Sequence, residues 1–192
     1  MKMAALQMVS GTDLSANLAT ARRLLEQAAH LGAELAVLPE YFCLMGQRDA
    51  DKLTLAEQPG HGPIQAMLSQ AARELGLWVV GGTLPIATPD PARVANTTLV
   101  FNPAGECAAR YDKIHLFRFD NGRERYDEAA VLVRGHEPVS FTLTPREGNP
   151  IRVGLSVCYD LRLPELYRLL AADLILVPAA FTHTTGQAHW EV

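Results

Sequence analysis

The sequence predicts an α/β fold in one domain. Strand and helix patterns alternate along the 192 residues, and no repeat, linker or low-complexity tract interrupts them. In addition, the β-branched apolar run Ile151–Val157 stops abruptly at Cys158, and Pro164 opens a helix after a short polar turn. A buried strand that delivers a single cysteine to such a turn is typical of α/β enzymes with a nucleophile.

The first half of the chain contains a β-α-β pattern. Lys2–Val9 is expected to form a strand, and either Asp13 or Ser15 to cap a helix that continues to about His30. Further strands are predicted at Leu35–Glu40 and Trp78–Thr83, with a second helix at Pro63–Leu75 that ends at Gly76.

The second half begins with a predicted hairpin, Val94–Phe101 and Cys107–Tyr111, around the turn residues 102–105. Lys113–Leu132 is expected to be a long irregular loop, which in a compact domain is commonly functional. The remaining predicted elements are strands at Ser140–Leu143, Ile151–Val157 and Leu174–Pro178 and a helix at Pro164–Ala172. The last helix-to-strand connection is so short that either the helix ends early or residues are missing there.

Composition excludes several classes of protein. The chain is 48% hydrophobic and 20% charged with a net charge of -4, so it lacks the basic surface that nucleic acids or anionic membranes attract. Its apolar runs are too short for a membrane span, and its N-terminus does not read as a signal peptide. Three widely spaced cysteines argue against a disulfide framework and favour a reducing, cytoplasmic setting. The six histidines show no metal-ligand spacing, and no cofactor is expected.

Three chemically useful residues end predicted strands: Glu40, Lys113 and Cys158. A carboxylate, an ammonium and a thiol at the carboxyl ends of strands can meet in one crevice of an α/β sheet. Each also has an ordinary structural interpretation. Glu40 could be a solvated loop carboxylate and Lys113 a surface amine paired with Asp112. Cys158 could be a small buried apolar residue.

The segments around these residues resemble the signatures of the nitrilase-type carbon–nitrogen hydrolases. They read LPEYF (38–42), YDKIHLF (111–117) and GLSVCYDLRLPELYR (154–168), in that family's order of Glu, Lys and Cys. The last motif resembles the small-acid amidase branch, which includes the ω-amidase and deaminated-glutathione amidase types. RYDEAAVLVRGHE (125–137) is similar to the segment with the family's second glutamate, which maps onto Glu128. The resemblance implies a four-layer α-β-β-α sandwich and a homo-oligomer.

The residue types suit amide hydrolysis. A free thiol has a pKa of about 8.5, so Cys158 needs a base, and Glu40 is expected to take its proton. Lys113 and the backbone N–H of Tyr159 are expected to hold the oxyanion that follows attack on the amide. Glu128 would then orient Lys113 or the departing amine.

Arg162 is a candidate to bind a substrate carboxylate, because guanidinium groups bind carboxylates bidentately. The alternative for Arg162 is a structural ion pair with Asp160 or Glu165. Cys43 and Cys107 are expected to have no chemical role.

The expected function is therefore hydrolysis of a linear amide of a small carboxylic acid, with release of ammonia. A nitrilase or an N-carbamoyl amino acid hydrolase is the alternative within the family, although Leu161 stands where a second arginine would favour carbamoyl substrates. A non-catalytic fragment that acts as an interaction module is the alternative outside it. The chain stops at AHWEV (188–192), in a motif that the family continues as a helix, so it is expected to lack the domain's C-terminal part and to associate through Leu174–Pro178.

Overall fold

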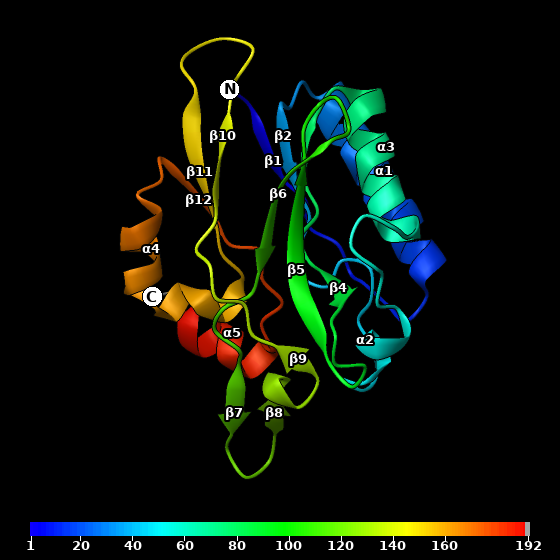
Figure 1. Cartoon of the computed structure of the whole chain (residues 1–192), viewed down its shortest axis with the longest axis vertical. Helices are drawn as coiled ribbons and strands as arrows, with labels where there is room; N and C mark the ends of the chain where they lie inside the picture. The colour runs from blue at the N-terminus through cyan, green and yellow to red at the C-terminus, as the bar shows by residue number, and fades with distance from the viewer. Residues whose placement is uncertain (191–192) are drawn as a thin grey trace.

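Two β-sheets lie face to face between two layers of helices in the computed structural model, which describes residues 1–190 (Figure 1). Helices α1 and α3 cover the outer face of the larger sheet, and α4 covers the smaller one. This is the expected four-layer α-β-β-α arrangement. Glu191 and Val192, at the end of the AHWEV motif, lie outside the described residues.

Five helices and twelve strands make up the described part of the chain. The helices are α1 (Leu14–His30), α2 (Asp51–Thr54), α3 (Pro63–Leu75), α4 (Pro164–Leu170) and α5 (His183–His189), with 3₁₀ turns η1 (Glu128–Ala130) and η2 (Cys158–Arg162). The strands are β1 (Met3–Ala5), β2 (Leu35–Val37), β3 (Trp78–Val80), β4 (Leu84–Ala87), β5 (Val94–Phe101), β6 (Cys107–Asp112), β7 (Arg118–Asp120), β8 (Arg125–Asp127), β9 (Leu132–Val133), β10 (Ser140–Leu143), β11 (Ile151–Leu155) and β12 (Leu174–Leu176).

The larger sheet has the order β1-β2-β3-β5-β4, with β6 and β9 also paired to β5. Strands β1, β2 and β3 are parallel, as the β-α-β pattern predicts, and β5 runs antiparallel to β3. The smaller sheet has the order β10-β11-β12, in which β11 and β12 are parallel. Helices join β1 to β2, β2 to β3 and β11 to β12, so the carboxyl ends of these parallel strands can present side chains at one edge of each sheet.

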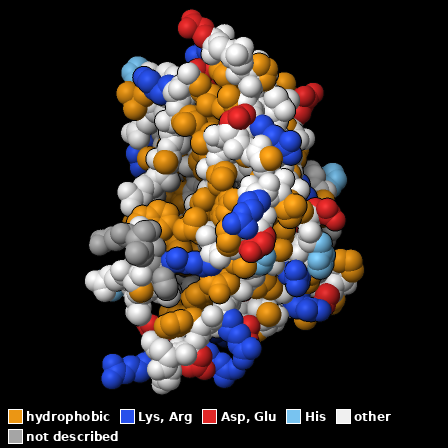
Figure 2. Space-filling view, turned by 90° about the vertical axis from the view of Figure 1, so that its left-hand side faces the viewer, with side chains coloured by type: hydrophobic (Ala, Val, Ile, Leu, Met, Phe, Trp, Pro, Cys, Tyr) orange, Lys and Arg blue, Asp and Glu red, His pale blue; other side chains and the backbone are white. Residues whose placement is uncertain are grey.

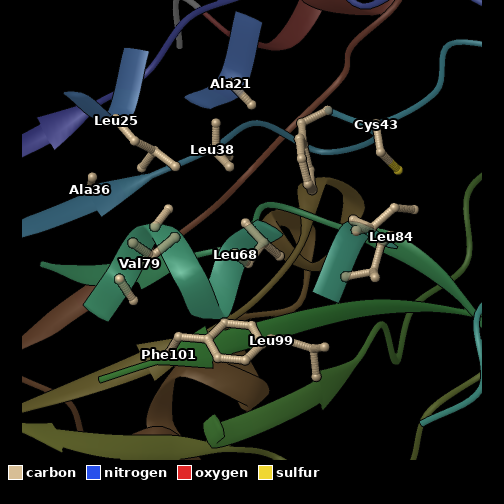
Figure 3. Packing of buried hydrophobic residues seen from close by; sticks show 14 of the residues in the cluster. Ala21, Leu25, Ala36, Leu38, Cys43, Leu68, Val79, Leu84, Leu99 and Phe101 are labelled. Atoms are coloured by element: carbon tan, nitrogen blue, oxygen red, sulfur yellow. The ribbon is translucent and has the colours of Figure 1, made fainter. Parts of the chain in front are cut away.

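Two apolar clusters hold the layers together. The first lies between α1, α3 and the larger sheet, where Leu25 and Leu68 pack toward Val79 and Phe101 (Figure 3). The second fills the space between the two sheets and reaches α4; its members include Leu35, Val80, Val100, Tyr111, Phe141, Val153, Leu155, Leu166 and Leu170. Because most of these side chains are completely buried, the positions of β2, β6 and β11 relative to one another are fixed by close packing.

Several elements match the predictions closely. Asp13, not Ser15, caps α1, since its Oδ1 accepts a hydrogen bond from the N–H of Ala16 at 3.0 Å. Helix α3 and strands β5 and β10 have the predicted bounds. Helix α4 ends early, at Leu170, and Ala171 adopts a left-handed conformation that opens the short connection to β12.

Other elements differ from the predictions. Strand β1 is confined to Met3–Ala5, although an apolar run to Val9 was expected to be extended, and Val9 is almost fully exposed. Strand β4 was not predicted; it contains Pro85 and lies at the edge of the sheet, where a missing N–H is tolerated. Helices α2 and α5 were also not predicted.

The segment expected to be irregular contains the hairpin of β7 and β8. Asn121 supplies the turn, because its Oδ1 accepts hydrogen bonds from the N–H groups of Arg123 and Glu124 at 2.9 and 2.7 Å. Within residues 1–190, no helix combines the length and hydrophobicity that crossing a bilayer requires.

Gly82 holds the chain next to the end of β2. It has a φ of 47°, and a Cβ at this position would collide with the backbone oxygens of Pro39 and Leu38, directly before Glu40. We predict that Gly82→Ala lowers the free energy of unfolding by about 3 kcal/mol or more in urea denaturation, because neither backbone can move freely. Gly76→Ala is the matched control: its φ is also positive, at 62°, but the space around it is open, so a loss of about 1 kcal/mol is expected. Equal losses in the two variants would contradict a constraint from close approach.

Candidate active site

The ends of three strands bring Glu40, Lys113 and Cys158 together. Glu40 follows β2, Lys113 follows β6 and Cys158 follows β11, and the three residues are 3%, 1% and 8% exposed. The Lys113 Nζ lies 3.0 Å from Glu40 Oε1, and on its other side 2.9 Å from Glu128 Oε2. The ordinary interpretations of Glu40 as a solvated carboxylate and Lys113 as a surface amine are therefore wrong.

The turn that carries Cys158 is held in an uncommon conformation. Cys158 has a φ of 47°, in the left-handed region, and its N–H donates to the carbonyl of Pro178 at 2.9 Å. Cys158 is the first residue of η2, and the buried residue Val157, two positions after the end of β11, directly precedes it. This is the sharp turn that the sequence predicts, and backbone strain of this kind is often found at functional sites.

Asp160 connects the cysteine turn to the chain on both sides of Lys113. This carboxylate is completely buried and accepts hydrogen bonds from the N–H of Val157 (2.8 Å) and the hydroxyl of Tyr111 (2.7 Å). It also accepts from the N–H of His115 at 3.0 Å and lies 2.7 Å from the His115 Nδ1. Sequence reasoning considered Asp160 only as a partner for Arg162 and missed this role; the tyrosine and histidine that flank Lys113 in YDKIH were the available signal.

Glu40 is surrounded by hydrogen-bond donors. Its Oε1 accepts from Lys113 and from the Asn96 Nδ2, both at 3.0 Å, and its Oε2 accepts from the N–H of Ala180 at 2.9 Å. The following residue, Tyr41, has a left-handed φ of 55°. Each carboxylate oxygen is therefore anchored by at least one donor from a different segment of the chain.

Glu128 lies at the start of η1 and is held in a similar way. Its Oε1 accepts from the Tyr41 hydroxyl at 3.0 Å, and its Oε2 accepts from the N–H of Phe117 at 2.7 Å. The side chain is 13% exposed, compared with 1% for Glu40. Glu128 is therefore the more accessible of the two carboxylates that contact Lys113.

The charges in this group influence one another strongly. Burial disfavours the ammonium of Lys113, but the negative charges of Glu40 and Glu128 outweigh burial and raise its pKa above the ordinary value. Burial raises the pKa of the Cys158 thiol well above its usual range, the charge of Glu40 raises it further, and Lys113 offsets only part of the rise. Cys158 therefore rests as a thiol at neutral pH, and a base must accept its proton before it can attack.

A cavity of about 430 Å³ opens onto this group. Tyr159 and Phe117 form part of its wall and stack edge to face, with ring centroids 5.6 Å apart. The cations that line the cavity are Lys113, Arg48, Lys52 and Arg125. Arg162 is exposed at the end of η2 and is not among the lining residues, so the structure does not bring it to the cavity.

The described residues offer no evident place for a metal. In residues 1–190, no three His, Cys, Asp or Glu side chains lie close enough together to hold an ion. The Cys158 thiol, the Glu40 and Glu128 carboxylates and the Lys113 ammonium all line the cavity and can act on a ligand there.

Glu40→Gln tests the electrostatic coupling to Cys158. Because the carboxylate raises the pKa of the thiol, we expect its replacement to lower that pKa and to make alkylation by iodoacetamide faster at neutral pH. Mass spectrometry of the labelled peptides gives the rate at Cys158 as a function of pH. Cys107 is exposed and serves as the internal control. Slower labelling of Cys158 in the variant would show that Glu40 does not repel the thiolate.

Comparison with known proteins extends these observations. A family described as carbon–nitrogen hydrolase matches residues 2–192. A deaminated glutathione amidase from Yersinia enterocolitica is 37% identical over 99% of this chain and 66% of its own length. A chloroplastic omega-amidase from Arabidopsis thaliana is 35% identical over 94% of this chain and 49% of its own. The chain thus spans between about half and two thirds of the length of these relatives.

Solved structures give the same assignment. The C. elegans NitFhit protein superimposes with a TM-score of 0.84 at 34% identity and covers 98% of this chain and 46% of its own. An amidase from Nesterenkonia sp. has a TM-score of 0.79 at 27% identity, over 98% of this chain and 68% of that one. The whole described fold is therefore shared with proteins of this group, and the chain belongs to the carbon–nitrogen hydrolase family.

Proposed function

We propose that the protein hydrolyses the carbon–nitrogen bond of linear amides of small carboxylic acids through a cysteine thioester. One observation carries the proposal: a buried Lys113 ammonium contacts both Glu40 and Glu128 beside a thiol at the end of a buried strand. An ammonium held by two carboxylates at the floor of a cavity suits a reaction in which negative charge develops on a substrate oxygen.

In the first half of the reaction, Cys158 attacks the amide carbonyl carbon while its proton passes to Glu40. The carbonyl electrons move onto the oxygen, where Lys113 and the N–H of Tyr159 donate to the oxyanion. Tyr159 is the second residue of η2, and N–H groups at the beginning of a helical turn have no acceptor within it. The carbon–nitrogen bond then breaks, and the nitrogen leaves as ammonia after taking the proton from Glu40.

In the second half, Glu40 accepts a proton from a water molecule, whose oxygen attacks the thioester carbonyl. The carbon–sulfur bond breaks, the acid is released and the sulfur recovers the proton from Glu40. The donors from Asn96 and Ala180 keep this carboxylate in one orientation through both steps. Glu128 also accepts a hydrogen bond from the Lys113 ammonium, at 3.0 Å, which supports a role in orienting Lys113.

The cations that line the cavity besides Lys113 suit an acidic group at the far end of the substrate. They are Arg48, Lys52 and Arg125; Asp49 lines the cavity as well and pairs with Lys52, its Oδ1 lying 2.6 Å from the Nζ. Lys52 is the most buried of the three cations, with its side chain 12% exposed and its Nζ 4.6 Å from the centre of the Tyr41 ring. These cations are better placed than the exposed Arg162 to receive a carboxylate, and the role predicted for Arg162 remains a prediction.

The relatives agree with this chemistry. Their names, deaminated glutathione amidase and omega-amidase, describe amidases. In one variant of the Nesterenkonia amidase, acrylamide has added to the active-site cysteine. Extending these activities to the present chain is our proposal, because it spans only part of the length of its relatives.

We also propose that the protein works as a cytoplasmic homo-oligomer. Figure 2 shows hydrophobic side chains gathered on the side of the molecule that carries α4. On this side Leu169 is 69% and Ile175 39% exposed, and β12 has one strand neighbour among the described residues. An apolar face beside a sheet edge favours pairing with another chain. The three cysteines are free, which suits a reducing compartment.

The activity and its nucleophile can be tested together. We expect the wild-type chain to release ammonia from ω-amides of dicarboxylic acids in preference to nitriles and N-carbamoyl amino acids, and Cys158→Ala to abolish the release while its circular dichroism spectrum stays unchanged. Cys107→Ala is the control, because this exposed thiol lies outside the residues that line the cavity and should keep full activity. Retention of about a tenth of the rate in Cys158→Ala would exclude the nucleophile assignment.

Lys113→Ala separates the two possible roles of the ammonium. If it stabilises the oxyanion, kcat falls by about a hundredfold or more, while KM changes little, because the charge on the oxygen develops only in the transition state. Steady-state kinetics on the best amide of the panel measures the two constants. A rise in KM alone would instead assign Lys113 to binding of the ground-state substrate.

A further inference from the structure

Asn96 lies between the segments that carry Glu40 and Lys113. It sits in the middle of β5 and is 1% exposed. Its backbone carbonyl accepts a hydrogen bond from the N–H of Lys113 at 2.9 Å. Its side-chain Nδ2 donates to Glu40 Oε1 at 3.0 Å and to the Tyr41 hydroxyl at 3.1 Å. Asn96 thus contacts Lys113 through its backbone and Glu40 through its side chain.

The other end of this side chain is unpaired. The Asn96 Oδ1 is buried and has no hydrogen-bond partner in the described part of the chain. Buried polar atoms are almost always paired in folded proteins, and an unpaired one needs an explanation. Rotating the amide by 180° would not help, because the oxygen would then face the carboxylate of Glu40. The orientation observed gives both N–H groups to the base and its neighbour and leaves the carbonyl without a donor.

We infer that Asn96 is a positioning residue for Glu40, which it holds in contact with Lys113, and that this role is retained at the expense of an unpaired carbonyl. The inference rests on the proposed amide hydrolysis. It distinguishes Asn96 from a residue that only fills space in the sheet, because a space-filling residue could be replaced by an apolar side chain of equal size without any effect on the base.

The charged groups around Glu40 determine how the loss of the Asn96 amide would change the pH dependence of activity and of Cys158 alkylation. The titratable groups that face this carboxylate are Lys113 after β6, Cys158 in η2 and the neighbouring Tyr41, with Glu128 on the far side of Lys113. Removing the amide takes one donor from the charged carboxylate and leaves its negative charge less compensated. The acidic limb of kcat/KM should therefore move to higher pH, and so should the pH midpoint of Cys158 alkylation.

Two variants of nearly equal shape test the inference. Asn96→Leu removes both N–H groups together with the unpaired carbonyl, and Asn96→Asp keeps the shape but replaces the donor by an oxygen. In both we expect kcat/KM to fall by about tenfold or more, chiefly through kcat, with the acidic limb displaced to higher pH. In Asn96→Leu the urea midpoint should change little, because removal of the buried unpaired carbonyl offsets the loss of the two hydrogen bonds that the amide donates.

Thr98→Val is the matched control. Thr98 lies two residues along β5 and is also completely buried, but its hydroxyl donates to the carbonyl of Gly82 at 2.7 Å and not to the carboxylates. This variant should lower the urea midpoint and leave the pH profile in place. The expected results of the two substitutions are therefore opposite: Asn96→Leu changes the pH profile without a loss of stability, and Thr98→Val does the reverse.

Iodoacetamide labelling of Cys158 separates failure of this inference from failure of the proposed function. If the wild type hydrolyses no amide, the proposed function is wrong, and Asn96 is still tested by the pH midpoint of labelling. An upward shift in Asn96→Leu and none in Thr98→Val supports the inference. The inference is overturned if kcat/KM of Asn96→Leu stays within threefold of the wild-type value with the same pH profile. It is also overturned if the pH midpoint of Cys158 labelling does not change. If Asn96→Leu does not fold, Asn96→Asp decides by the same criteria.

Discussion

The buried contact of Lys113 with Glu40 and Glu128 is the interaction on which the rest of the site depends. An ammonium that is 1% exposed would be strongly destabilised without a partner, and removing one member of such a group typically costs about 3–5 kcal/mol. The two carboxylates come from segments 88 residues apart in number, after β2 and at η1, so the ammonium also joins distant parts of the chain. Because the two carboxylates outnumber the single ammonium, the three side chains together repel a thiolate at Cys158 more than they attract it. Cys158 is therefore kept protonated, and in the proposed mechanism Glu40 takes its proton.

Rigid packing and buried hydrogen bonds share the task of placing these groups. The apolar cluster between the sheets sets the approximate positions of β2, β6 and β11, through side chains such as Leu35, Tyr111 and Leu155. Asp160 then refines the position of the cysteine turn by joining it to Tyr111 and His115, which flank Lys113. The unpaired carbonyl of Asn96 belongs to the same set of constraints. A buried polar atom without a partner costs about 1–3 kcal/mol, which is a considerable part of the stability of a domain.

The sequence predicted the parts of this arrangement that depend on local pattern. The abrupt end of the strand before Cys158 and the strand-end positions of Glu40 and Lys113 follow from hydrophobic periodicity and turn residues, and their convergence follows from sheet geometry. Asn96 was missed because the strand also contains Thr97 and Thr98, so nothing sets it apart, and because its side-chain partners lie more than fifty residues away. Tyr41 was missed although it directly follows Glu40, because its hydroxyl meets partners from distant segments, Asn96 and Glu128. Strand β4 was also missed: it contains Pro85, which a strand tolerates at the edge of a sheet, and no sequence pattern shows which strand will be at the edge.

The different surroundings of the three thiols have a consequence for oxidative damage. Peroxides react with thiolates, and burial raises the pKa of Cys43 to about 12 and that of Cys158 well above its usual range. Cys107 is exposed on β6, so oxidants reach its sulfur most easily. An oxidant would accordingly modify a residue outside the cavity before it modified the sulfur inside, and the resting molecule would keep its reactive group in the reduced form without any separate protective device.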